Sequence, residues 1–122
     1  MIDHVTLQVR DVPMSKAFYE VLLAPLGMSI GFDDGSVVGF FGSTPGALWL
    51  SPAQRSEDRE LHLAFAALSR QVVQAFHDAA VGLGAEILHA PRLFPEYGEH
   101  YFGAFVRDPD GHNIEAVCRR AE

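Results

Sequence analysis

The chain contains an internal duplication, and this feature constrains the fold more than any other property of the sequence. The pairs His4-Val5 and Ala17-Phe18 are followed, 58 residues later in each case, by the similar pairs His62-Leu63 and Ala75-Phe76. A repeat of this length that occurs only twice favours two pseudo-symmetric halves packed together over an open array of small repeats.

The first half reads as βαβββ. Apolar and polar residues alternate over 2–9, which predicts a half-buried strand. Asp11 then caps a helix that has Pro13 in its first turn. Three more strands are expected at 28–32, 37–41 and 47–51, separated by turns.

The second half repeats this order. We expect a strand at 61–66, a helix capped by Ser69, a strand at 85–89, a Pro-rich loop at 90–99 and a closing hairpin. Asp108-Pro-Asp-Gly111 has the residues of a tight turn between the two hairpin strands. The predicted fold is therefore α+β in a single domain, with module one at about 1–51, a linker at about 52–60 and module two at about 61–120.

Helical spacing predicts which residues of the two helices face the core. In the first helix these are Met14, Phe18, Val21 and Leu22, and in the second Val72, Val73, Phe76, Ala80 and Leu83.

His4, His62 and Glu115 share one property: each lies in a strand on the face opposite the strongly apolar one. If the apolar faces pack under the helices, the three side chains look away from the helices and converge where the sheets curve. Two imidazoles and a carboxylate suit Zn²⁺, Fe²⁺, Mn²⁺, Co²⁺ or Ni²⁺, with coordination positions open for substrate. A single His or Glu on a strand is more often an ordinary half-exposed residue, which is our interpretation of His77 and His89.

Charge and composition exclude several classes of protein. A net charge of −7 argues against binding to a nucleic-acid backbone. Cys118 is the only cysteine, so no disulfide forms within the chain, which suits a reducing cytoplasm. No stretch has the length and apolarity of a membrane span.

The chain resembles the vicinal oxygen chelate superfamily, which contains glyoxalase I, fosfomycin-resistance thiol transferases, extradiol dioxygenases and bleomycin-resistance proteins. The resemblance covers essentially the full length. It is carried by the segments Asp3-His-Val-Thr-Leu7, Ser15-Lys-Ala-Phe-Tyr19, Leu26-Gly27, His62-Leu-Ala-Phe65 and Phe105-Val-Arg-Asp-Pro-Asp-Gly-His-Asn-Ile-Glu115. The closing motif is specific for the fold and much less specific for the reaction.

The resemblance implies paired βαβββ modules that form a cupped sheet with helices outside, around one divalent metal ion held by His4, His62 and Glu115. In glyoxalase I a fourth ligand, a Glu that helps to move the substrate proton, comes from the last strand of the first module. Two alignments put Trp49 or Leu50 there, and neither binds metal. This departure counts against efficient lactoylglutathione lyase activity. The short chain weighs against a four-module dioxygenase.

The loop and strand over 92–102 supply further candidates. Tyr97 and His100 are the candidate acid–base groups, Arg92 is suited to hold an anion, and Tyr101 to donate a hydrogen bond to substrate. Trp49 is a candidate for an apolar wall of the substrate site, although core packing is the preferred interpretation of this residue.

The sequence favours a metal-dependent enzyme of glyoxalase-like, thiol-transferase or dioxygenase type that acts on a small substrate through adjacent oxygens. The alternatives are a metal-free protein that sequesters a ligand, of the bleomycin-resistance type, and a relative that binds metal without turnover. A homodimer is expected, because one βαβββ unit leaves open sheet edges and because in two-module relatives the paired modules commonly belong to different subunits.

Overall fold

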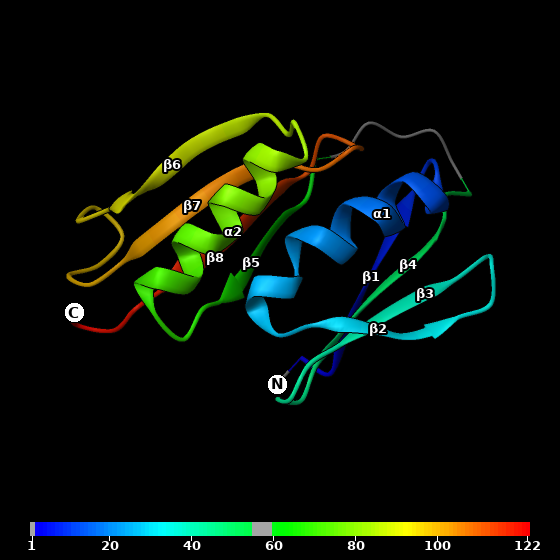
Figure 1. The fold of residues 1–122 in the computed structure, drawn as a ribbon, viewed down its shortest axis with the longest axis horizontal. Helices are drawn as coiled ribbons and strands as arrows, with labels where there is room; N and C mark the ends of the chain where they lie inside the picture. Colours follow the sequence, from blue (N-terminus) through cyan, green and yellow to red (C-terminus); the bar gives the residue numbers. More distant parts are fainter. Residues whose placement is uncertain (1, 55–59) are drawn as a thin grey trace. The chain divides into compact units, whose positions relative to one another are not determined.

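The computed structural model describes residues 2–54 and 60–122, which form two compact units that divide between Arg59 and Glu60 (Figure 1). We call the first unit module one and the second module two. Among the described residues, no helix is long and apolar enough to cross a membrane.

Module one is a four-stranded mixed sheet with one α-helix. Its elements in chain order are β1 (His4–Val9), α1 (Val12–Leu22), the 3₁₀ helix η1 (Ala24–Leu26), β2 (Ser29–Asp33), β3 (Val38–Phe41) and β4 (Ala47–Pro52). The strand order is β1-β4-β3-β2, in which β1 and β4 are parallel and the other pairs antiparallel.

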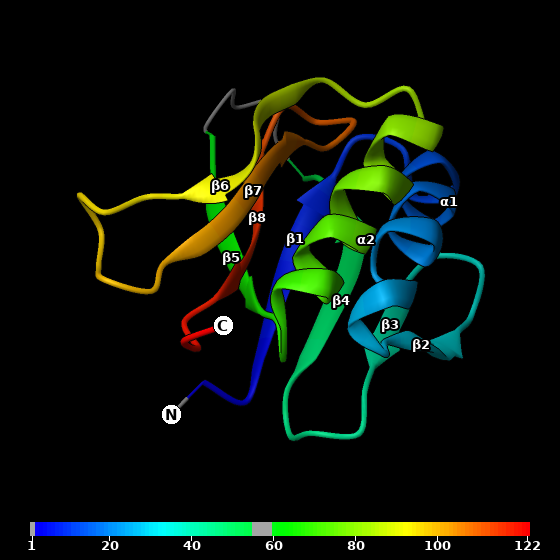
Figure 2. The same cartoon turned by 60° about the vertical axis from the view of Figure 1, so that its left-hand side comes forward.

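Module two repeats this arrangement. Its elements are β5 (His62–Ala66), α2 (Arg70–Gly82), β6 (Ile87–Leu93), β7 (Phe102–Arg107) and β8 (Asn113–Cys118). The order β5-β8-β7-β6 matches that of module one, with β5 and β8 parallel. In both modules the helix lies along one face of its own sheet (Figures 1 and 2). The predicted fold class, α+β with two βαβββ modules that each carry a mixed sheet, is confirmed.

Both helices begin where the sequence predicts. The Asp11 carboxylate accepts a hydrogen bond from the backbone N–H of Met14 at 2.9 Å, and the Ser69 hydroxyl oxygen accepts one from the backbone N–H of Val72 at 3.2 Å. These caps satisfy N–H groups that have no partner inside the helix.

The buried face of α1 differs from the predicted one. Phe18 and Leu22 are buried as expected, but Met14 and Val21 are 56% and 46% exposed. Tyr19 is fully buried instead, and its ring packs against Phe40 of β3 at a centroid distance of 6.4 Å. Tyrosine carries a polar hydroxyl on an apolar ring, and the hydrophobic pattern therefore does not include it among the buried residues. As a result, the predicted buried face of α1 is rotated from the observed one by part of a turn. In α2 the buried residues, Val73, Phe76 and Ala80, are among those predicted.

Strand β6 is longer than predicted, because it continues through Pro91 to Leu93, where the sequence indicates a loop. Proline is tolerated at this position because β6 is an edge strand and its pairing with β7 is irregular between His89 and Arg92. Strand β4 extends to Pro52, the first residue of the predicted linker at about 52–60. The linker's residues 55–59 lie outside the described part of the chain.

Candidate functional site

The turn between β7 and β8 fixes the start of β5, and thereby His62. One Asp108 oxygen accepts hydrogen bonds from the backbone N–H groups of Asp110 at 3.0 Å and His112 at 2.8 Å. The His112 imidazole, through Nδ1, then accepts one from the backbone N–H of Leu61 at 2.9 Å. Asp108 and His112 are both buried, so this turn ties two segments that are distant in sequence into one rigid corner.

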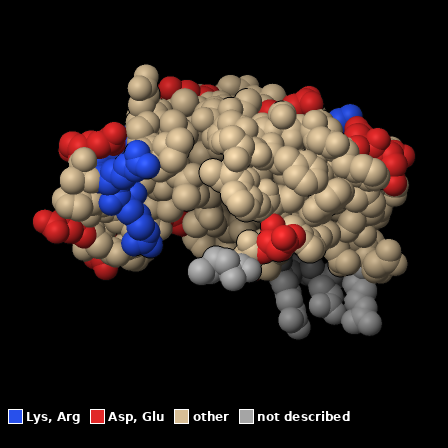
Figure 3. Space-filling view, turned by 90° about the horizontal axis from the view of Figure 1, so that it is seen from below, with Lys and Arg blue, Asp and Glu red and all other residues tan. Residues whose placement is uncertain are grey.

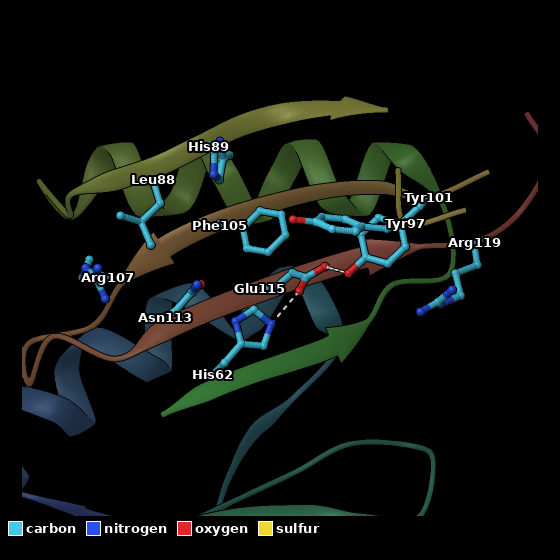
Figure 4. Close-up of a pocket in the computed structure, with 10 residues that line it drawn as sticks. All are labelled: His62, Leu88, His89, Tyr97, Tyr101, Phe105, Arg107, Asn113, Glu115 and Arg119. Carbon is cyan, nitrogen blue, oxygen red and sulfur yellow. Dashed lines mark hydrogen bonds and ion pairs between the residues drawn. The ribbon is translucent and has the colours of Figure 1, made fainter. Parts of the chain in front are cut away.

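Glu115 is the centre of a polar network on the face of the sheet that looks away from α2 (Figure 4). Its side chain is 2% exposed. The Tyr101 hydroxyl donates a hydrogen bond to Oε1, and Nε2 of His62 lies 2.9 Å from Oε2. A buried carboxylate is costly unless its oxygens are bonded, and here each oxygen has a partner.

The surroundings keep Tyr101 protonated. Burial, followed by the hydrogen bond to Glu115 and the negative charge of that carboxylate, raises the pKa of Tyr101 to about 12. The positive charge of Arg119 acts in the opposite direction. The hydroxyl therefore remains a donor to Glu115 over the whole physiological pH range.

Gly103 leaves the room that this contact needs. A methyl group at Gly103 would lie 3.3 Å from Oε1 of Glu115 and 3.3 Å from the Tyr101 ring. That distance is tight enough to push the two side chains apart. The residue is thus small because the tyrosine and the carboxylate meet above it.

A cavity of about 720 Å³ opens over this network, entirely within module two. Its lining combines aromatic, basic and ligand-type side chains: His62, Leu88, His89, Tyr97, Tyr101, Phe105, Arg107, Asn113, Glu115 and Arg119 (Figure 4). The volume lies within the range of small-molecule sites, roughly 300–1,000 Å³. The mixture of aromatic walls with a few polar groups is typical of such sites.

The residues predicted from the loop over 92–102 fall into two groups. Tyr97 and Tyr101 line the cavity, and their rings meet at a centroid distance of 5.4 Å. Arg92 and His100 are not among the lining residues. The Arg92 guanidinium lies 3.6 Å from the centre of the Phe94 ring and donates to the backbone oxygen of Leu93, while Nε2 of His100 lies 3.8 Å from the Glu99 carboxylate.

His4 and Trp49 belong to module one. The His4 side chain is 56% exposed, and its Nδ1 lies 2.8 Å from the carboxylate of Asp3. Trp49 packs edge-on against Phe41 at 5.4 Å and against Phe32 at 5.6 Å. Within each module, the described residues contain no group of three His, Cys, Asp or Glu side chains that could hold a metal ion.

The strand register identifies the module-one counterpart of Glu115. His4 pairs with Ala47 in β1 and β4, as His62 pairs with Asn113 in β5 and β8. Two residues further along, Trp49 corresponds to Glu115. Leu50, the other alignment, is fully buried on the opposite face.

Sequence reasoning missed six residues of the cavity, of which two are apolar, Leu88 and Phe105, and four are polar: His89, Arg107, Asn113 and Arg119. Asn113 lies two residues before Glu115 in β8, so its side chain is on the same face of the sheet. Arg107 of β7 pairs with Asn113. Alternation along the strands could therefore have identified both residues. The sequence predicts that strand β6 ends at His89, and a histidine at a strand end is interpreted as an ordinary half-exposed residue. Arg119 follows the last strand, and no pattern in the sequence marks it.

The family profile described as the glyoxalase/bleomycin resistance protein/dioxygenase superfamily matches residues 1–116. The solved structures that are similar to the chain include the following three. A glyoxalase/bleomycin resistance protein from Albidiferax ferrireducens T118 is 31% identical, with a TM-score of 0.82, over 98% of this chain and 99% of that chain. A glyoxalase-related enzyme from Fulvimarina pelagi is 20% identical, with a TM-score of 0.76, over 97% and 87%.

A glyoxalase/bleomycin resistance protein/dioxygenase family enzyme from Burkholderia phytofirmans PsJN is 18% identical, with a TM-score of 0.76, over 97% and 98%. At these lower identities the likeness supports the fold alone. Among proteins of curated function, none matches the chain. Since the family profile spans nearly the whole chain and the first relative matches it from end to end, the chain belongs to the glyoxalase/bleomycin resistance protein/dioxygenase superfamily.

Proposed function

We propose that this protein is a metal-dependent enzyme that acts on a small substrate bound in the module-two cavity, with His62 and Glu115 as two of the metal ligands. The observation that carries the proposal is the pairing of His62 Nε2 with Glu115 Oε2, 2.9 Å apart, on a carboxylate buried at the cavity.

This pair fits a divalent ion. In an octahedral site, two neighbouring ligands bonded to one ion at ~2.1 Å and at a right angle lie about 3.0 Å apart, close to the observed separation of 2.9 Å. Tyr101 occupies Oε1, so Oε2 is the oxygen that faces His62. Hydrogen bonds of this kind behind a ligand are a regular feature of metal sites, because they fix the ligand's orientation.

His4 is the proposed third ligand, since it holds in β1 the position that His62 holds in β5. A bound ion of this class supplies Lewis-acid chemistry toward adjacent substrate oxygens. Tyr97 is the proposed acid–base group. It lines the cavity, whereas His100 does not.

The test compares two histidine variants in protein purified without chelator or added metal. His62→Ala should reduce bound metal sharply, while His100→Ala, a histidine of module two outside the cavity, should retain it. Chelator should lower the melting temperature of the wild type and of the His100 variant but not that of His62→Ala, because bound metal stabilises the folded state by mass action. Equal metal content in all three proteins would contradict the proposal. A metal-free wild type that still retains small ligands would instead favour a sequestering protein.

We also propose a homodimer in which His4 of one chain completes the site of the other. A His4→Ala chain mixed with a Glu115→Ala chain under subunit exchange should regain metal binding, because each heterodimer then holds one intact site. Failure of the mixture to recover metal would remove the shared site, and a monomer in light scattering would remove the dimer.

The reaction proposed is not that of an efficient lactoylglutathione lyase. Trp49 occupies the position at which glyoxalase I has its fourth ligand, and an indole cannot bind metal or carry the substrate proton. With the hemithioacetal of methylglyoxal and glutathione, we expect kcat/KM below roughly 10⁴ M⁻¹s⁻¹ with each of several divalent metals. A larger value would show that another group replaces the missing carboxylate.

A further inference from the structure

Arg119 presents a positive charge to the cavity that no carboxylate of the described residues neutralises. Its guanidinium lies over the face of the Tyr101 ring, 4.7 Å from the ring centre, and within residues 2–54 and 60–122 it has no hydrogen bond or ion pair. Arg107, the other cavity arginine, is occupied: it donates to Glu60 and, at 2.8 Å, to the backbone oxygen of Gly111. Arg119 is therefore the cation at this cavity that is available to a ligand.

The cavity lining is less acidic than the protein as a whole. The chain carries a net charge of −7, whereas the lining holds two arginines and one carboxylate. Arg107 is paired with Glu60, and the Glu115 oxygens bond Tyr101 and His62. Arg119 is therefore the charge without a partner of opposite sign among the lining residues. On the face drawn in Figure 3, the larger group of basic side chains lies over the module-two end, with acidic side chains beside it, and a smaller basic area lies at the other end. The Arg119 end of the cavity therefore presents a local positive charge, which attracts and orients anions.

Contact with Tyr101 holds the guanidinium in place for such a role. An arginine stacked on an aromatic face keeps its N–H donors free at the edge of the plane. The hydroxyl of the same tyrosine reaches Glu115, so about one aromatic ring separates the cation from the buried carboxylate (Figure 4). Tyr97 and Phe105 provide an apolar wall beside this path.

We infer that Arg119 anchors an oxyanion, a carboxylate or a phosphoryl group, of a small ligand that extends past Tyr101 toward His62 and Glu115. The guanidinium fork matches both groups with paired N–H donors. Asn113, in the same cavity, has a buried Oδ1 without a hydrogen-bond partner among the described residues, and it offers an acceptor to a hydroxyl or amide of the same ligand. The proposed anion-binding role of Arg119, which we call the anion anchor, is independent of metal binding. Only the proposal that the other end of the ligand reacts at His62 and Glu115 rests on the proposed function.

The test uses chelator-treated protein, so that no metal ion contributes to anion binding. Phenyl phosphate and benzoate are the anionic probes, and benzamide is a neutral probe of similar shape. Dissociation constants by NMR titration should show that the wild type binds at least one anion in preference to benzamide. Arg119→Gln should weaken that binding by roughly ten-fold or more, and Arg119→Lys should lose part of it, because lysine keeps the charge without the fork.

Arg120→Gln is the matched control, since Arg120 is the next residue and is also exposed but does not line the cavity. It should bind the anions as the wild type does. Preference for phenyl phosphate or for benzoate identifies the phosphoryl or carboxylate class, and either supports the proposal. Absence of anion binding to the wild type, equal binding of benzamide, or equal loss in the Arg119 and Arg120 variants would overturn it.

Metal content separates this inference from the proposed function. In protein prepared without chelator, Arg119→Gln should bind as much metal as the wild type, because Arg119 packs on Tyr101 and forms no hydrogen bond or ion pair with His62 or Glu115. Anion binding in a protein that takes up no metal would refute the metal proposal and leave the anion anchor intact. Metal binding in a protein that binds no anion would refute the anion anchor and leave the metal proposal intact.

Discussion

The two modules have the same strand order and the same register. They differ on the sheet face that looks away from the helix, which carries an aromatic cluster in module one and a polar network beside a cavity in module two. In module one, Trp49 of β4 lies opposite Gly39 of β3. At the corresponding place in module two, Glu115 of β8 lies opposite Phe105 of β7. A bulky aromatic next to a glycine closes the first face, whereas the second presents a carboxylate beside a cavity.

The difference is one of packing as well as chemistry. A methyl group at Gly39 would come within 2.7 Å of the Trp49 ring, so the indole fills the space above the glycine. In module two the network of Glu115, Tyr101 and His62 takes that place and stays connected to a cavity. A duplicated scaffold can thus keep its fold through the residues under the helix and diverge through a few residues on the other face.

The largest expected contrast is in metal affinity. Glu115→Gln keeps the shape of the side chain and an acceptor for Tyr101 but removes the anionic ligand. We expect metal affinity to fall by more than about 100-fold, since even residues behind a ligand contribute about 10–100-fold. Trp49→Phe, at the equivalent position, should leave metal content unchanged. Mass spectrometry of both proteins checks the contrast, and equal metal loss in the two variants would contradict it.

The Tyr101 hydroxyl should matter next. Tyr101→Phe removes the donor to a buried charged group, and we expect a loss of about 1.5–3 kcal/mol in the free energy of unfolding. Because the pKa of Tyr101 is raised from 10.0 to about 12, the stabilisation is present in full below pH 10 and is lost as the pH rises through about 12. Absorbance titration should show a tyrosine step near pH 12 in the wild type that is missing in the variant. If the two proteins gave the same titration curve near pH 12, the raised pKa of Tyr101 would be contradicted.

Gly39→Ala tests the packing of module one. The added methyl group meets the Trp49 ring, and overpacking of this kind costs about 1–3 kcal/mol. The cost should shrink in a Trp49→Leu background, because the smaller side chain leaves space above residue 39. Urea unfolding of the two single variants and the double variant gives the coupling between the positions. An undiminished cost in the double variant would assign the strain to the backbone of β3.

Much of the fold follows from local sequence signals. The duplication predicts two modules, Asp11 and Ser69 predict where the helices begin, and Asp108 predicts the hairpin turn. Two of the differences from the predicted elements also have local causes. Tyr19 shifts the buried face of α1, and Pro91 is accommodated because β6 is an edge strand.

The site is less accessible to sequence reasoning. Strand phase predicts that His62 and Glu115 share a face, because alternation along a strand is fixed by geometry. It does not predict that Tyr101 reaches Glu115, since that contact depends on how the chain returns from Phe94 into β7. Nor does it distinguish Arg92, which Phe94 holds outside the cavity, from Arg119, which lines it.

The smallest expected effect concerns a polar contact on the outside of module one. Nζ of Lys16 in α1 lies 2.7 Å from the carboxylate of Asp33 in β2, and both side chains are partly exposed. The hydrogen bond between them is the main cause that raises the pKa of Lys16 and lowers the pKa of Asp33. The Asp33 contribution to stability is therefore present above its ordinary pKa of 3.8 and is lost as the pH falls through the lowered value.

Asp33→Asn keeps an oxygen that accepts from the backbone N–H of Gly35 and removes only the charge. Because water and salt screen an exposed pair, the melting temperature at neutral pH should fall by less than in Tyr101→Phe, and the difference should vanish in 1 M NaCl, where the screening length is about 3 Å. The loss caused by Tyr101→Phe should persist at the same salt concentration, since its partner carboxylate is buried. A salt-resistant loss at Asp33 would mean that the carboxylate acts through the turn that follows β2 and not through its charge.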